Sequence, residues 1–157
     1  MNNNQPARFG HRIERTFEVS ATPEQVWAAI ATAEGIGEWM VPTVLDPRTF
    51  GEVSFDLGET ISRGVITDYT PHRRFAYAEP WPMAEHMATA HLDITGLTPI
   101  ATEFLIESVS GGSCVLRVVS SAYGTGADWE NEFFSEMVEG WAALLDNLAK
   151  HLDATNR

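Results

Sequence analysis

The sequence predicts an α+β fold in which a mostly antiparallel sheet packs against one long C-terminal helix. Three observations support this prediction. Several segments between residues 13 and 121 alternate apolar and polar residues with a period of two, as half-buried strands do. Residues 129–152 instead repeat apolar side chains every three or four positions, as amphipathic helices do. The patterns follow the order strand, two short helices, a run of strands and the long helix.

The composition is that of an ordinary globular protein. The chain has 157 residues, of which 44% are hydrophobic and 20% are charged, and this length predicts one domain. We expect a flexible N-terminal tail over residues 1–11 and the single domain over residues 12–152. The tail lacks the apolar core of a signal peptide, and no segment approaches the ~20 apolar residues of a membrane span. A single cysteine excludes an intramolecular disulfide, and together these features favour the cytoplasm.

The charge balance limits the classes of partner. With 22 acidic and 10 basic residues the formal net charge is −12, so nucleic acids and anionic membrane surfaces would be repelled. Arg73 and Arg74 are the one adjacent pair of basic residues. Such a pair is more typical of a solvated strand end than of a phosphate site. We therefore expect neither nucleic-acid binding nor membrane binding.

The first strand and the first helix have the clearest local signals. Residues 13–19 alternate apolar and polar side chains, and only Arg15 breaks the apolar face. After this strand Thr22 is suited to cap a helix, and Pro23 fits its first position. Gln25 follows the cap by three residues, as a capping box requires. This pattern predicts a helix that begins at residue 23.

The remaining strands follow a second short helix or turn, which we expect around residues 36–40. Alternation with a period of two predicts strands at residues 51–57, 60–70, 73–79, 101–109 and 113–121. Gly111 and Gly112 suit a tight hairpin between the last two, so the sheet is expected to be mostly antiparallel. Residues 80–99 have prolines at both ends and no clean period. They predict a long loop with up to one helical turn, of a length that usually has a function or some disorder.

The last helix is predicted over residues 129–152, with Asp128 as its cap. Glu130 and Glu132 lie near its positive end, where they suit the helix dipole. One stripe of the helix is apolar and consists of Phe133, Met137, Trp141, Leu144, Leu145, Leu148 and Leu152. At ~1.5 Å per residue such a helix is about 36 Å long. It can therefore cover the apolar face of a whole sheet.

The order of elements and several motifs resemble one known superfamily. The motifs are "IERTFEVSATPEQVWAAIAT", "GEWM", "GEVSFDL", "GVITDYTPHRRFAYAE" and "EGWAALLDNLAKHL". They are similar to the SRPBCC (START-like) superfamily, in particular its AHSA-type branch, named for the activator of heat-shock-protein-90 ATPase, and the resemblance spans about residues 12–152. It implies a helix-grip (START-like, Bet v-like) fold, in which a curved antiparallel sheet wraps the C-terminal helix and leaves an apolar tunnel. Residues 80–99 depart from the pattern, because they are longer than the expected connection.

The tunnel that this resemblance implies suggests a site for a hydrophobic small molecule, since such pockets are mostly apolar with a few fixed polar groups. We expect its lining to come from inward-facing strand positions, the long loop and the last helix. The alternative is that these side chains fill a solid core. The candidate ligand-binding residues are Trp39, Phe55, Tyr77, Trp81, Phe104, Tyr123, Phe133, Met137 and Trp141.

Few residues indicate catalysis or metal binding. His86 and His91, with Glu85, could form a metal or acid/base site, but their spacing differs from the one-turn spacing of helical zinc motifs. His72 follows a proline and is expected in a turn. Cys114 is expected to be a small buried apolar residue. We expect no metal site and no cofactor.

The remaining carboxylates and the search for catalytic motifs likewise give little indication of catalysis. Glu52, Asp56, Glu103 and Glu107 occupy outward strand positions and predict a solvated sheet face. No nucleophile elbow, P-loop or dinucleotide-binding glycine motif is present. If a reaction is catalysed, the resemblance to the cyclases and hydrolase-like members of the superfamily points to Tyr77, His86 and Tyr123 as proton-exchanging groups.

The function predicted from the sequence is therefore to bind or carry an apolar small molecule in a cavity between the sheet and the C-terminal helix. Two alternatives stay open, namely a small-molecule enzyme of cyclase or hydrolase type that uses the same pocket and a co-chaperone-like regulator of a heat-shock ATPase. A homodimer through an open sheet edge is also compatible with the sequence. The sequence leaves open whether any reaction is catalysed.

Overall fold

The computed structural model describes residues 9–81, 97–109 and 112–155. Within these ranges a seven-stranded antiparallel sheet has the strand order β1-β7-β6-β5-β4-β3-β2. The elements are β1 (Phe9–Val19), α1 (Pro23–Ile30), α2 (Ala33–Trp39), β2 (Thr43–Leu45), β3 (Glu52–Asp56), β4 (Ile61–Thr70), β5 (Arg74–Glu79), β6 (Ile100–Val109), β7 (Ser113–Gly124) and α4 (Asp128–Thr155).

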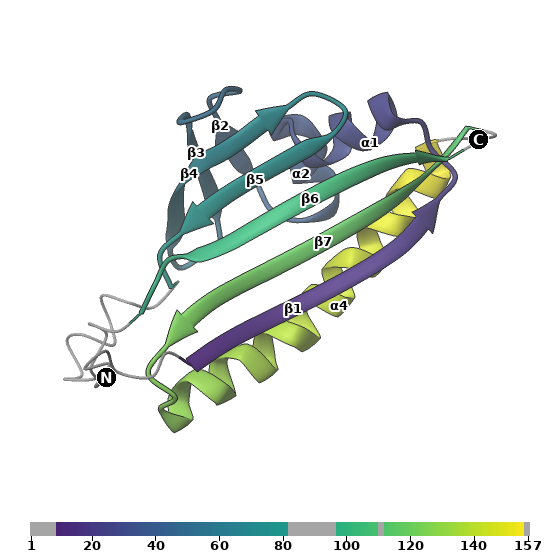
Figure 1. The fold of residues 1–157 in the computed structure, drawn as a ribbon. Coiled ribbons are helices and arrows are strands. Elements are labelled where there is room, and N and C mark those ends of the chain that lie inside the picture. Colours follow the sequence, from purple (N-terminus) through teal and green to yellow (C-terminus); the bar gives the residue numbers. More distant parts are fainter. Residues whose placement is uncertain (1–8, 82–96, 110–111, 156–157) are drawn as a thin grey trace, which may run out of the picture.

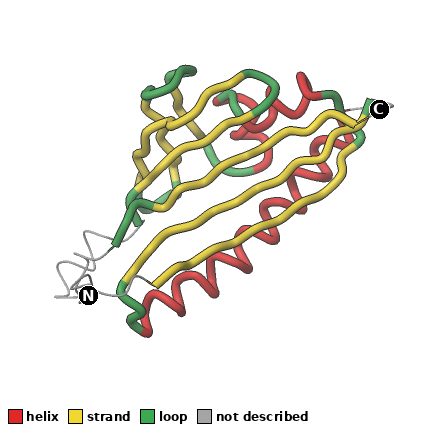
Figure 2. Tube along the Cα trace, in the orientation of Figure 1, coloured by secondary structure: helices red, strands yellow, loops and turns green. Residues whose placement is uncertain are grey.

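The sheet and the helices form two layers. Figure 1 shows α4 running lengthwise beside β1, and α1 and α2 both approach α4. Figure 2 shows the strands side by side as one curved layer. The predicted α+β fold class is confirmed, namely a curved antiparallel sheet around a long C-terminal helix with two short helices after the first strand. No helix in the described ranges is long and apolar enough to cross a lipid bilayer.

The short helices form because their ends are capped. The Thr22 side chain accepts from the Gln25 backbone N–H at 3.2 Å, and the Gln25 side chain accepts from the Thr22 N–H at 2.9 Å, which confirms the predicted capping box. Thr32 caps α2 in the same way by accepting from the Gly35 N–H at 3.0 Å. This second cap starts α2 at residue 33, three residues before the predicted start.

The first strand is longer than the pattern indicated. Phe9 pairs with Gly124, and His11 pairs with Ala122 of β7. Residues 9–11 were expected in the flexible tail, and the structure corrects that boundary because they belong to β1. Gly10 and His11 carry no apolar alternation, so the pairing depends on backbone hydrogen bonds that leave no trace in the side-chain pattern.

Two other element ends differ from the prediction, and most of the predicted long loop cannot be compared. β2 has only three residues, too few for a periodic signal. Asp128 is the first residue of α4 and not its cap. Residues 82–96, most of the predicted loop, lie outside the described residues. Hydrogen-bonding and backbone geometry decide such ends, and element ends are the part of a structure that side-chain patterns locate least well.

The face of the sheet towards α4 holds the core. Alternate residues along the strands are buried there, among them Val53, Phe55, Phe75, Phe104 and Leu116. The predicted apolar stripe of α4 packs against the same core. Its members Trp141, Leu145, Leu148 and Leu152 are buried, whereas Phe133, Met137 and Leu144 are partly exposed. The stripe is thus buried along the C-terminal half of α4 and less so near its N-terminal end.

Candidate functional site

Three hydroxyl side chains lie in a row across the core face of the sheet. Tyr77 of β5 pairs with Thr102 of β6, and Thr102 pairs with Ser120 of β7. The Thr102 and Ser120 hydroxyl oxygens are 2.8 Å apart, and all three residues are buried. We call Tyr77, Thr102 and Ser120 the hydroxyl row. It places polar groups on a face that is otherwise apolar.

The phenol of Tyr77 is suited to hydrogen bonding and not to proton abstraction. Burial raises the pKa of Tyr77 well above its usual value, and the nearby charge of Glu79 raises it further, while a hydrogen bond with Thr102 opposes both effects. The phenol therefore stays protonated at neutral pH. A protonated phenol can donate to a polar atom of a bound molecule.

Glu79 adds a carboxyl group to the same face. It follows Tyr77 by two positions on β5, so both side chains point towards the core. The Ser62 hydroxyl of β4 donates to Glu79 Oε2 at 2.5 Å. Burial raises the pKa of Glu79, and the hydrogen bond from Ser62 offsets part of that rise. The sequence analysis missed Glu79, although the spacing of Phe75, Tyr77 and Glu79 is the signal that reveals it.

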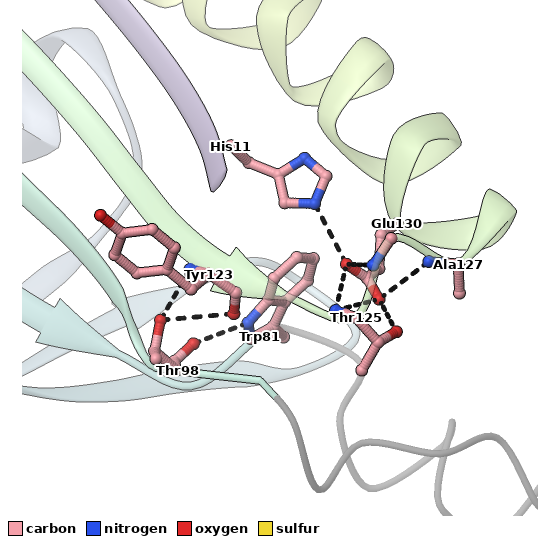
Figure 3. Close-up of polar contacts among 8 residues, drawn as sticks. His11, Trp81, Thr98, Tyr123, Thr125, Ala127 and Glu130 are labelled. Carbon is pink, nitrogen blue, oxygen red and sulfur yellow. Dashed lines mark hydrogen bonds and ion pairs between the residues drawn. The ribbon is translucent and has the colours of Figure 1, made fainter. Parts of the chain in front are cut away.

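A buried carboxylate lies where α4 begins. Figure 3 shows the side chains of Glu130 of α4 and His11 of β1 pointing towards each other, with Trp81 nearby. Glu130 is fully buried, and His11 Nε2 lies 3.1 Å from its Oε1. The Thr125, Gly126 and Ala127 backbone N–H groups donate to the same carboxylate at 3.0 to 3.3 Å, and the Thr125 hydroxyl donates as well. We call Glu130, His11 and these donors the carboxylate cradle.

The cradle keeps Glu130 ionised. Burial by itself raises the pKa of this carboxyl, but the hydrogen bonds from the side chains of Thr125 and His11 and from the backbone of Thr125 and Gly126 outweigh burial and lower the pKa to about 2. An ionised carboxylate only accepts hydrogen bonds, so His11 Nε2 carries a proton. A Cβ at Gly124 would lie 1.9 Å from Glu130 Oε1, so this position has no room for a side chain.

Aromatic side chains surround the cradle. The His11 ring stacks on Phe134 with a centroid distance of 4.4 Å. Trp81 lies 5.7 Å from Trp129 and 5.1 Å from each of Phe133 and Phe134, again between ring centroids. We call Trp81, Trp129, Phe133 and Phe134 the aromatic end cluster. It lies at the N-terminal end of α4, beside the part of the helix stripe that is less buried.

The structure brings together eight of the nine predicted lining residues. Trp39, Phe55, Tyr77, Phe104 and Trp141 belong to the main core cluster, and Trp81 belongs to a second cluster with Ile100, Ala122 and Phe134. Phe133 packs against the second cluster, and Met137 packs against both.

Tyr123 does not join these residues. Its side chain is 51% exposed, because Ala122 and Gly124 of β7 face the core and position 123 therefore faces away from it. Its ring lies against Gly10 of β1, which has no side chain in the way. The expectation that Tyr123 shares a pocket with the other eight residues is not supported by its place on the sheet.

Comparison with known proteins identifies the family. A family model described as "Activator of Hsp90 ATPase homolog 1-like protein" (AHSA1) matches residues 20–153. The chain belongs to this AHSA1 family. No curated protein sequence is similar enough to match this AHSA1 chain.

Solved structures share the fold of this AHSA1 chain. Protein MLL2253 from Mesorhizobium loti is 16% identical, with a TM-score of 0.74 and coverage of 94% of this chain and 100% of that one. The Aha1 dimer from Colwellia psychrerythraea is 17% identical, with a TM-score of 0.69 and coverage of 91% and 96%. CalU16 from Micromonospora echinospora is 18% identical, with a TM-score of 0.65 and coverage of 93% and 85%. At these identities the likeness shows the fold, and it confirms the predicted helix-grip architecture.

The other candidate residues of the AHSA1 chain that the structure describes have partners and positions typical of residues that support the fold. Cys114 is buried, its thiol donates to the Ala21 carbonyl at 3.1 Å, and burial raises its pKa. His72 occupies the turn between β4 and β5, as predicted, with a φ of 67°. Arg74 pairs with Asp68 and Glu103 at 2.6 and 2.5 Å. Glu85, His86 and His91 lie outside the described residues, and within the described ranges no three His, Cys, Asp or Glu side chains are grouped to hold a metal ion.

Proposed function

We propose that this AHSA1-family protein binds or carries an apolar small molecule between the core face of the sheet and the N-terminal half of α4. The supporting observation is that, among the residues that the structure describes, the buried apolar side chains form two clusters separated along β6 and β7. Thr102 lies between Phe104 of one cluster and Ile100 of the other, and Ser120 occupies the same place on β7.

The residues that join the two clusters are incompletely buried. Ile13 and Met137 pack against both clusters, yet both are partly exposed. A close-packed interior would bury such side chains fully. Apolar walls with a few convergent hydroxyls are the usual character of a small-molecule site. The proposed lining is Trp39, Phe55, Tyr77, Trp81, Phe104, Phe133, Met137 and Trp141.

A filling variant tests this proposal. The neutral dye Nile red is expected to bind saturably to the purified protein. Met137→Trp adds volume between the two clusters and is expected to weaken dye binding by about tenfold or more. Val138→Trp is the matched control, because Val138 is the next residue of α4 and is 48% exposed. Dye affinity in this control is expected to stay within about twofold of the wild type.

Two outcomes would contradict the proposal. One is the absence of saturable dye binding to the wild type, and the other is an equal effect of both tryptophan variants. Native mass spectrometry of protein purified from its own host adds an independent test. Its expected result is a co-purifying apolar compound that dissociates when Met137 is replaced by tryptophan.

A small-molecule enzyme that uses the same site is the second candidate. The observation that favours it is Glu79, a half-buried carboxyl with a raised pKa and a hydroxyl partner, which is the kind of group that exchanges protons in active sites. Conversion of a co-purified compound by the wild type and its loss in Glu79→Gln would establish this candidate. Release of the same compound unchanged would favour binding alone.

A regulator of a heat-shock ATPase is the remaining alternative, and the name of the family suggests it. Stimulation of Hsp90 ATPase by the purified protein would support this role, and its absence together with dye binding would reject it. Dimer formation is a related proposal, because the Colwellia neighbour is a dimer and β1 and β2 are edge strands of the sheet. Light scattering during gel filtration measures the oligomeric state directly.

A further inference from the structure

We infer that Glu79 and Ser62 form the polar anchor of the ligand site, and that they select an apolar molecule with a protonated amine over one with a carboxylate. This inference rests on the proposed function and deepens it by naming the chemistry of the ligand head group. Its evidence is the placement, the burial and the hydrogen-bond partners of the two residues.

The two side chains meet on the core face of the sheet. Glu79 is the last residue of β5 and pairs with Ile100 of β6, which belongs to the second apolar cluster. Ser62 of β4 is buried at 6% exposure and donates to Glu79. Glu79 is therefore held beside Ile100 of the second cluster and two positions from Tyr77 of the hydroxyl row.

A glycine of the neighbouring strand lies close to the stem of Glu79. Gly64 of β4 occupies a core-facing position, and a Cβ there would lie 3.2 Å from the Glu79 Cβ and 2.6 Å from the Ala78 carbonyl oxygen. This position therefore has no room for a side chain, and Ser62 is the β4 side chain that hydrogen-bonds Glu79 on this face.

Within the described residues, few of the hydrogen-bond acceptor positions of the Glu79 carboxyl are occupied. An ionised carboxylate has about four acceptor positions, and within the described residues Ser62 is the only side chain that donates to Glu79. Arg63 points to the opposite face of β4 and is exposed, and Arg74 is engaged by Asp68 and Glu103. A half-buried carboxylate with one neutral donor is costly, and a cationic donor would relieve that cost.

A ligand with a carboxylate head group would instead be repelled by Glu79. Two carboxylates at hydrogen-bond distance repel each other unless one takes up a proton. The raised pKa of Glu79 fits a group that lacks a cationic partner in the unliganded protein. An amine supplies up to three donors to the remaining acceptor positions of Glu79.

The experiment compares three probes with the same alkyl chain. Decylamine, decanol and decanoic acid are each titrated against Nile red bound to the wild type at neutral pH. We expect decylamine to act at concentrations about tenfold lower than decanoic acid, with decanol between them. In Glu79→Gln the ratio between amine and acid is expected to fall to about twofold or less.

The control removes the same charge elsewhere. Because the protein carries a net charge of −12, it attracts any cation. Glu107→Gln makes the same change on the outer face of β6, where Glu107 is exposed, and it is expected to keep the wild-type ratio. Glu79→Leu also removes the charge, but unlike Glu79→Gln it does not introduce an amide at this position. It is expected to lose the preference for the amine over the acid while it still binds decanol.

The outcomes separate this inference from the proposed function. Equal displacement by amine and acid in the wild type, or the same ratio in Glu79→Gln and Glu107→Gln, overturns the inference and leaves the apolar site intact. A dye that does not bind, or that none of the three probes displaces, overturns both.

Discussion

Replacing Glu130 with glutamine is expected to lower the free energy of unfolding by about 3 kcal/mol at neutral pH. The carboxylate accepts from His11, from the Thr125 hydroxyl and from three backbone N–H groups. The backbone neighbours are all donors, so an amide NH₂ at this position would face N–H groups and could donate only if the Thr125 hydroxyl or the His11 ring changed its role to acceptor. Urea denaturation followed by tryptophan fluorescence measures the change.

The same residue predicts an acid-sensitive stability. The pKa of Glu130 in the folded protein is lowered to about 2 from its ordinary value of 4.5. Its contribution is therefore complete above pH 4.5 and is lost as the pH falls from 4.5 towards 2. In Glu130→Gln this part of the pH dependence is expected to disappear, so the difference between wild type and variant should shrink over that interval.

A matched control lies two positions along the same helix. Glu132→Gln makes an equal change of charge at an exposed position, and it is expected to shift the free energy of unfolding by no more than about 0.5 kcal/mol. Similar losses in both variants would show that the net charge of the helix end matters and that the cradle does not.

Gly124 provides a double-mutant cycle for the cradle. Gly124→Ala places a Cβ where Glu130 Oε1 lies, so it is expected to destabilise the wild type strongly. In a Glu130→Ala background the added methyl group has room, and the cost of Gly124→Ala is expected to fall by more than about 1 kcal/mol. Additive effects of the two changes would contradict the geometry of the cradle.

Replacing Gly35 with alanine is expected to cost about 3 kcal/mol or more, because α1 and α2 approach each other too closely there for a methyl group. A Cβ at this position would lie 1.8 Å from the Ala28 carbonyl oxygen and 2.8 Å from the Ala29 Cα. Both of these atoms are backbone, so no side-chain rotation relieves the overlap. The helices must move apart, which exposes Ile36 and Trp39.

Gly37 is the control in the same helix. A Cβ at Gly37 meets no atom within 4 Å, so Gly37→Ala is expected to stabilise the protein by about 0.5 to 1 kcal/mol through the helix propensity of alanine. Thermal unfolding of both variants measures the contrast. If Gly35→Ala is as stable as Gly37→Ala, the close contact between α1 and α2 is wrong.

The Gly35 variant also bears on the ligand site. Trp39 ends α2, its indole N–H donates to the Ala29 carbonyl at 2.8 Å, and its ring approaches Phe104. A shift of α2 would move this proposed lining residue. At a temperature where Gly35→Ala remains folded, we expect weaker Nile red binding than in Gly37→Ala.

Much of the fold follows from patterns that are local in the chain. The period of two along residues 52–56 and 74–79, the capping box at Thr22 and the apolar stripe of α4 each depend on neighbours within a few positions. Local patterns of this kind, together with the order of the elements, were sufficient for the fold class, whereas the predicted ligand-binding lining stays a prediction. The interactions that form these elements connect residues within a few positions of each other, and the sequence patterns involve the same residues. The patterns and the structure therefore agree.

The chemistry of the candidate site depends instead on partners that are distant in the chain. His11 and Glu130 are separated by 119 positions and Ser62 and Glu79 by 17, and no periodicity links either pair. In the sequence Glu130 resembles an ordinary acidic residue of a first helical turn, and His11 resembles part of a tail. Pairing of β1 with β7, together with the packing of α4 against β1, brings His11 to Glu130, and pairing of β4 with β5 brings Ser62 near Glu79, so tertiary contacts connect side chains that no local signal links.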